Sequence, residues 1–203
     1  SLQGAAANAL QINGSVAPAE VRAEHGTCTS AGYSYSGGLV LSHRGTLPEL
    51  IARRAERTPS ALAIHAIDRP PLSFAGLMAH MGGVASALAD RGLGRGDAIA
   101  VMVPTGPDMA SAFLSVAGAA VCAPLNSAYG RAELEFFIDD LSARALLIAA
   151  DLDSPARDVA REKGLSIMEL APLPGESAGR FTIDGRLPPP AEVREPSPDD
   201  IAL

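Results

Sequence analysis

The chain has 203 residues, 47% hydrophobic and 19% charged, which allows one globular domain or two small ones with a buried core. Acidic residues outnumber basic residues by 23 to 16, and this net charge of −7 argues against nucleic-acid binding, which needs a cationic surface. The longest apolar stretch, 112–125, falls short of the roughly 20 residues of a membrane span. The two cysteines, Cys28 and Cys122, are expected to be free thiols in a reducing compartment, which predicts a cytoplasmic protein.

The N-terminal part of the chain divides into a leader and a first helix. Residues 1–45 are rich in Ala, Gly and Ser without a sustained period, which predicts a flexible leader. Thr46 and Glu49 have the spacing of a capping box, so a helix is expected to begin there. Proline disfavours helical conformation in the residue before it, so Pro59 is expected to end this helix.

A short hairpin and the clearest amphipathic helix follow. The segment 61–67 is β-like, a turn follows at 68–71, and 72–74 returns as a short strand. Apolar residues then recur at three- and four-residue spacing over 74–88, which predicts a helix. Gly92 stands where the C-cap of that helix is expected.

From residue 98 onwards, apolar strands alternate with helices. The expected strands are 98–103, 121–125, 145–150 and 165–170, and the expected helices are 107–119, 132–141 and 154–163. Strands that are apolar throughout indicate a parallel sheet covered on both faces. The sequence therefore predicts an α/β subdomain over 46–170, with a mostly parallel sheet and helices on both faces. The Pro-rich remainder, 171–203, is expected to be a surface connection that contributes no core element.

The usual signatures of catalytic and metal sites are missing from the sequence. The glycines of "GLGRGD", 92–97, follow a helix and precede a strand, whereas a dinucleotide-binding loop follows a strand and opens a helix. The four histidines show no metal-ligand spacing, and His65 and His80 are expected to have ordinary scaffold roles. We therefore assign no catalytic residue and no metal ligand.

Two loops that follow strands are the best candidates for a binding site. Ligands of open α/β sheets bind beyond the carboxyl ends of the strands. The loops "PTGPD", 104–108, and "PLNSAYGR", 124–131, both place polar groups at a helix N-terminus, which favours an anion. The alternative is plain capping, with Asn126 or Ser127 closing a turn and Tyr129 packing.

The order of these segments resembles the N-terminal part of adenylate-forming enzymes: acyl-CoA synthetases, luciferases and peptide-synthetase adenylation domains. "LSFAGL" is similar to the family's L-[ST]-[YF]-x-x-L, and "GLGRGDAIAVMVPTGPDMASAFLSVAGAAVCAPLN" is similar to its G-D-x-V-A to P-[LI]-N region. Thr105 stands where the family often has Asn, and Ser127 where many members have Pro. "APLNSAYGRAELEFFIDD" looks most like the oxalyl-CoA synthetase branch. The resemblance runs from about residue 46 to residue 203.

The resemblance implies the fold of the N-terminal subdomain and the chemistry of an AMP-forming acid–CoA ligase. That chemistry joins a carboxylate to ATP, releases pyrophosphate and then forms a thioester with CoA, so ATP, Mg²⁺ and CoA are the cofactors implied for the parent enzyme. In the family, the motif matched by "PDDIAL" leads into the phosphate loop, so this chain is expected to lack the ATP-binding motifs, to be inactive alone and to bind no cofactor alone. The resemblance places five residues in the wall of the acyl or CoA channel: Thr105, Asn126, Ser127, Tyr129 and Arg131.

Two further expectations concern what such a chain does by itself. A non-catalytic interaction or scaffolding module built on the same subdomain is the alternative to the enzyme. Strands that are apolar on both sides need cover on both faces, and in the family part of that cover comes from later segments. We therefore expect this chain to self-associate when it is alone.

Overall fold

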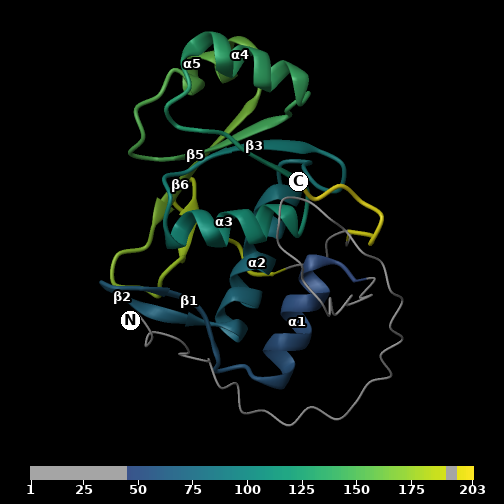
Figure 1. The fold of residues 1–203 in the computed structure, drawn as a ribbon, viewed down its shortest axis with the longest axis vertical. Helices are drawn as coiled ribbons and strands as arrows, with labels where there is room; N and C mark the ends of the chain where they lie inside the picture. The colour runs from purple at the N-terminus through teal and green to yellow at the C-terminus, as the bar shows by residue number, and fades with distance from the viewer. Residues whose placement is uncertain (1–44, 191–195) are drawn as a thin grey trace, which may run out of the picture. The chain divides into compact units, whose positions relative to one another are not determined.

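The first elements are a capped helix and a β-hairpin. The computed structural model describes residues 45–190 and 196–203 (Figure 1); residues 1–44, nearly all of the expected leader, lie outside this part. Helix α1 (Leu47–Arg57) begins at the predicted capping box, in which the Thr46 amide donates to Glu49 Oε2 at 3.0 Å and the Glu49 amide to Thr46 Oγ1 at 3.4 Å. Strands β1 (Leu62–Ala66) and β2 (Arg69–Ser73) pair antiparallel.

Helix α2 leads into a five-stranded sheet. The helices are α2 (Phe74–Ala89), α3 (Pro107–Ala117), α4 (Arg131–Asp140) and α5 (Ala156–Glu162). The strands are β3 (Ala98–Met102), β4 (Val121–Pro124), β5 (Ala145–Ala149), β6 (Ser166–Pro172) and β7 (Phe181–Ile183). The strand order is β4-β3-β5-β6-β7, in which β7 runs antiparallel to β6 and the other neighbours are parallel. The predicted fold class is confirmed.

Helices cover both faces of this sheet, as the apolar strands required. Figure 1 shows α4 and α5 on one face and α2 and α3 on the other. Alternate residues of β3 divide between the two cores: Ala100 and Met102 lie with α4 and α5, and Ile99 and Val101 with α2 and α3. Side chains that alternate along a strand point to opposite faces, so strands with no polar member must be buried on both.

The same turn ends α2, α4 and α5 and aims the chain into the next strand. After α2, the Gly92 amide donates to Ala89 O and the Leu93 amide to Leu88 O, at 2.9 and 3.0 Å, the pattern of a Schellman motif. Gly92 has φ 67°, which confirms its predicted capping role. Gly164 and Ser142 occupy the equivalent position after α5 and α4, with φ 71° and 48°. Ser142 is the one of the three that carries a Cβ in the left-handed region.

The segment after residue 170 contributes to the core. The expectation that residues 171–203 form only a surface connection is wrong for residues 178–183, because β7 pairs with β6 and extends the sheet. Ala178, Phe181 and Ile183 are all fully buried, and Phe181 is among the largest of the fully buried side chains. The apolar pattern of a strand this short is hidden among the prolines and glycines around it.

Candidate functional site

The candidate site is the carboxyl edge of the parallel sheet, where three loops leave neighbouring strands. In the order β4-β3-β5, the loops 125–130, 103–106 and 150–155 emerge side by side. The Leu125 amide donates to Val101 O at 2.9 Å and so ties the start of the β4 loop to the end of β3. This is the edge at which open α/β sheets bind ligands.

The β3 loop carries Thr105 to the start of α3. Thr105 is exposed, and α3 begins at Pro107 with no side-chain cap from Gly106. Within the described residues the Thr105 side chain makes no hydrogen bond. Asp108 lies in the first turn of α3, where its charge suits the helix dipole, but it is bound by the guanidinium of Arg69. Thr105 is therefore placed at the edge with its hydroxyl in solvent.

The contacts of the β4 loop are largely those of turn closure and packing, the alternative to ligand binding. Asn126 Oδ1 accepts the Ala128 amide at 2.9 Å, and Asn126 O accepts the Tyr129 amide at 3.1 Å, so Asn126 closes its own turn. The Tyr129 ring stacks on Phe137 of α4 with centroids 5.0 Å apart. Ser127 is exposed at the tip of the turn. Asn126 and Tyr129 thus shape the loop, and Ser127 presents the hydroxyl.

Arg131 is committed to carboxylates at the start of α4. Its guanidinium pairs with Glu135 at 2.7 Å and also with Glu162 of α5. Its hydrogen bond to Glu162 and the charge of Glu162, helped by Glu135, raise the pKa of Arg131 above its usual value. Glu133 accepts the Gly130 amide at 2.8 Å and so occupies one of the free N–H groups of this helix terminus. An anion here would compete with three carboxylates.

The third loop, after β5, was not singled out from the sequence. Ser154 is buried before α5, and its hydroxyl oxygen accepts the Ala156 amide at 3.2 Å. Arg157 fills the end of β5, because its guanidinium donates to Ala149 O at 3.0 Å and to Ala150 O at 3.2 Å and pairs with Glu169 of β6. These contacts satisfy carbonyls that the sheet leaves open and fix the loop against the edge.

Arg69 is the most fully bonded side chain near the edge, and sequence reasoning missed it. Its Nη1 donates to both carboxylate oxygens of Asp108, at 2.8 and 2.9 Å. Its Nη2 donates to Ser177 O and Arg180 O, at 2.8 and 3.0 Å, and its Nε to Glu176 O at 3.4 Å. Arg69 thereby fastens the β1–β2 hairpin to α3 and to the turn before β7. Its partners are too distant in sequence for any local pattern to reveal them.

Two buried titratable side chains lie away from the edge. Burial, reinforced by the positive charge of Arg180, lowers the pKa of His80 to about 4, and the ring packs edge-on against Phe181 with centroids 4.4 Å apart. Burial raises the pKa of Cys122 to about 12, so its thiol is neutral and a poor nucleophile. His80 fits the predicted scaffold role, although neither of its ring nitrogens has a hydrogen-bond partner among the described residues.

The arginines at the carboxyl edge of the sheet are paired with carboxylates. Across residues 45–190 and 196–203, no three His, Cys, Asp or Glu side chains gather so that they could hold a metal ion. The arginines of the carboxyl edge, Arg69, Arg131 and Arg157, are each paired with a carboxylate. The contacts of these residues hold three loops in place at one edge of the sheet.

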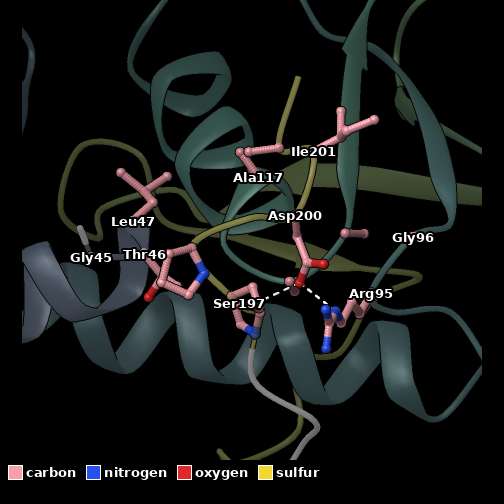
Figure 2. A pocket seen from close by; sticks show the side chains of 14 residues that line it. Gly45, Thr46, Leu47, Arg95, Gly96, Ala117, Ser197, Asp200 and Ile201 are labelled. Atoms are coloured by element: carbon pink, nitrogen blue, oxygen red, sulfur yellow. Dashed lines mark hydrogen bonds and ion pairs between the residues drawn. The ribbon is translucent and has the colours of Figure 1, made fainter.

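Two hollows lie around β4. One, of about 130 Å³, lies at the amino ends of β3 and β4, between the Arg95–Gly96 turn and the segment 196–202 (Figure 2). The other, of about 240 Å³, is an apolar groove along the open edge of β4, lined by Tyr129, Phe137, Leu141 and Leu203. Tyr129, one of the predicted site residues, therefore lines this groove. No helix in the described part of the chain is long and apolar enough to cross a membrane.

A mostly parallel sheet covered by helices on both faces, with three loops at its carboxyl edge, defines an open α/β fold of the kind that binds ligands at that edge. The chain belongs to the family of AMP-binding enzymes, whose sequence profile matches residues 51–203. It is 33% identical over 111 residues to a subunit of the plipastatin synthase of Bacillus subtilis, covering 54% of this chain and 4% of that protein. It is 32% identical over 123 residues to oxalate–CoA ligase of Arabidopsis thaliana, covering 60% of this chain and 24% of that protein.

The structure also aligns with a solved enzyme of this kind. ATP-bound MatB from Rhodopseudomonas palustris superposes with a TM-score of 0.56 at 26% identity, over 67% of this chain and 26% of that one. The chain therefore spans about a quarter or less of the relatives it matches. It corresponds to the N-terminal portion of an adenylate-forming enzyme, and the predicted family is confirmed.

Proposed function

We propose that this chain is the N-terminal scaffold of an AMP-forming acid–CoA ligase that converts a carboxylate, ATP and CoA to an acyl-CoA, AMP and pyrophosphate. The observation that supports this most directly is the match of the AMP-binding enzyme profile to residues 51–203, a stretch that contains the whole parallel sheet. The likeness to ATP-bound MatB points to ATP as the nucleotide. We propose a cytoplasmic location, because two cysteines suggest no disulfide framework and Cys122 is a free, buried thiol, as is usual in a reducing compartment.

In this proposal, the chain positions the loops at the carboxyl edge of the sheet and does not carry out the chemistry. The loops after β3 and β4 carry Thr105 and Ser127 with their hydroxyls in solvent, and Asn126 and Tyr129 hold the β4 loop in shape. Arg131, at the start of α4, pairs with Glu135 and with Glu162 of α5. We place the five predicted site residues in the wall of the acyl or CoA channel of the parent enzyme. We assign Mg²⁺ and ATP to the parent enzyme because the resemblance implies them, and we place no metal ligand among the described residues.

The identity of the carboxylic acid substrate is the least constrained part of this proposal. The relatives include a ligase named for oxalate and a probable nonribosomal peptide synthetase, at 32% and 34% identity, so the similarity favours neither class of enzyme by itself. The P-L-N-x-A-Y stretch at 124–129 resembles the oxalyl-CoA branch, and we propose a small carboxylic acid of that kind with CoA as the acceptor thiol.

The experiment is ATP–pyrophosphate exchange across a panel of carboxylic acids that includes oxalate, followed by detection of the CoA thioester. It compares the 203-residue chain with the product of the gene's full reading frame. We expect the short chain to give no exchange above a no-protein control, and the full product to give exchange and a thioester. A full product with neither activity, in folded protein, would favour the non-catalytic scaffolding module. Exchange by the short chain would place the chemistry on residues that we regard as scaffold.

A further inference from the structure

Strand β4 forms one edge of the five-stranded sheet. β4 lies at one end of the sheet order, so within residues 45–190 and 196–203 no strand pairs with one side of its backbone. Unpaired edge strands attract other chains, and proteins protect them with prolines, charges or covering segments. The apolar groove along this edge adds exposed apolar surface, which makes the edge more prone to bind another chain.

The hydrogen-bond donors of this edge can be counted. The amides of Val121 and Leu125 donate to Asp97 O and Val101 O, at 3.0 and 2.9 Å, so they point towards β3. Backbone direction alternates along a strand, so the nitrogens that face outwards within β4 are those of Cys122 and Pro124. Pro124 has no N–H, which leaves the Cys122 amide as the one outward donor of the strand. That amide donates to Ala202 O at 2.9 Å.

The segment that supplies this acceptor is not held by its apolar side chains. Ile201 and Leu203 are 70% and 71% exposed, and a hollow of about 130 Å³ lies beneath the segment. Its polar anchor is Asp200, which forms an ion pair with Arg95 in the turn before β3 (Figure 2). Asp200 Oδ2 also accepts the Ser197 amide at 2.6 Å and so closes the turn that leads into the segment.

We propose that Arg95 and Asp200 form a latch that seats residues 200–203 on the open edge of β4 and thereby closes its one outward donor. Arg95 lies in the turn before β3, and β3 pairs with β4. The ion pair between Arg95 and Asp200 therefore sets which residue of the segment 200–203 lies beside Cys122. The side chains of Arg95 and Asp200 are 33% and 21% exposed, which leaves their attraction only partly screened by water. With the latch closed, the edge of β4 offers carbonyl acceptors and no donor. Self-association of this chain through β4 then requires residues 200–203 to leave the edge first.

The test is amide hydrogen exchange in the 203-residue chain, read at Cys122. Asp200→Asn removes the charge but keeps an oxygen for the Ser197 turn, and Arg95→Met removes the other half of the pair. We expect either substitution to speed exchange of the Cys122 amide about fivefold to tenfold, and the double variant to add little beyond the single ones. The amides of Val121 and Leu125, which bond to β3, should keep their rates.

Asp199→Asn is the matched control, because it makes the same charge change at the neighbouring exposed residue. It should leave the Cys122 rate unchanged. Equal acceleration by Asp199→Asn would show that net charge, and not the latch, controls the segment, and would overturn the proposal. An unchanged Cys122 rate in both Asp200→Asn and Arg95→Met would overturn it as well. So would equal acceleration at Val121 and Leu125, because that would report opening of the sheet. None of these outcomes depends on whether the parent protein is a ligase.

Discussion

Replacing Arg69 with Met should be the most damaging single change of a charged residue in the described part of the chain. Arg69 and Asp108 are 19% and 18% exposed, and the guanidinium donates to the carboxylate and to three backbone carbonyls. The methionine retains the apolar stem and removes every donor. Asp108 then keeps a charge without its partner, and the carbonyls of Ser177 and Arg180 must find water in a restricted space.

The expected loss can be estimated from this geometry. Breaking a buried ion pair by removing one partner destabilises by about 3 to 5 kcal/mol, and the partial exposure of this pair places it at the lower end, about 3 kcal/mol. For a unit of the size of residues 44–203, this corresponds to a fall of about 6 to 12 °C in Tm. Arg69→Lys keeps the charge but not the fork of donors, so it should fall between the wild type and Arg69→Met.

The assay is urea unfolding followed by circular dichroism, with Arg131→Met as the matched control. Arg131 also pairs with two carboxylates, but it is on the surface of α4, so its loss should leave the midpoint nearly unchanged. A double-mutant cycle with Asp108→Asn isolates the pair itself, and we expect a coupling of at least about 1 kcal/mol. If Arg69→Met and Arg131→Met destabilise equally, the reasoning about Arg69 fails.

Two further predictions concern acid stability and a helix end. The pKa of His80 is lowered to about 4 from 6.5, so the unfolded chain binds the proton more tightly and stability is lost as the pH falls from 6.5 towards 4. That loss of stability should reach up to about 3 kcal/mol. His80→Leu should remove this pH dependence from the free energy of unfolding. A pH profile that is unchanged in His80→Leu would contradict the claim that His80 causes it. Ser142→Gly should raise the free energy of unfolding by about 0.5 kcal/mol, because Ser142 has φ 48° at an exposed position. Gly164→Ala, at the equivalent turn with φ 71°, should lower it by about 1 kcal/mol, and the same sign for both changes in urea titrations would refute the explanation.

The elements of the parallel sheet could be predicted because their causes are local. β3 and β5 are apolar at every position, and only strands buried on both faces tolerate that composition. The capping box at Thr46 and the turn at Gly92 involve hydrogen bonds between residues a few positions apart, so the sequence carries them almost completely. The loops of the candidate site follow from the same alternation, because the carboxyl ends of parallel strands share one edge.

The state of the site residues was not predictable to the same degree. Sequence reasoning left open whether the β4 loop binds a ligand or only caps a helix, and the contacts of Asn126 and Tyr129 are those of capping and packing. Arg131 is an attractive anion ligand by type, but its pairing with Glu162 depends on how α5 lies beside α4. These outcomes depend on neighbours that only the packed fold supplies.

The sequence by itself determined the class of fold, the positions of the helices and of the strands up to β6, and the family resemblance, because each depends on residue types at short spacing. Tertiary structure alone decided three things: the addition of β7 to the sheet, the fastening of Arg69 to Asp108, and the closure of β4 by Ala202. Each of these joins residues separated by nine or more positions, and the free energy of such a contact depends on where the folded chain places both partners. No local period reports that placement, so short or polar segments such as 178–183 and 196–203 reveal their roles only in the folded molecule.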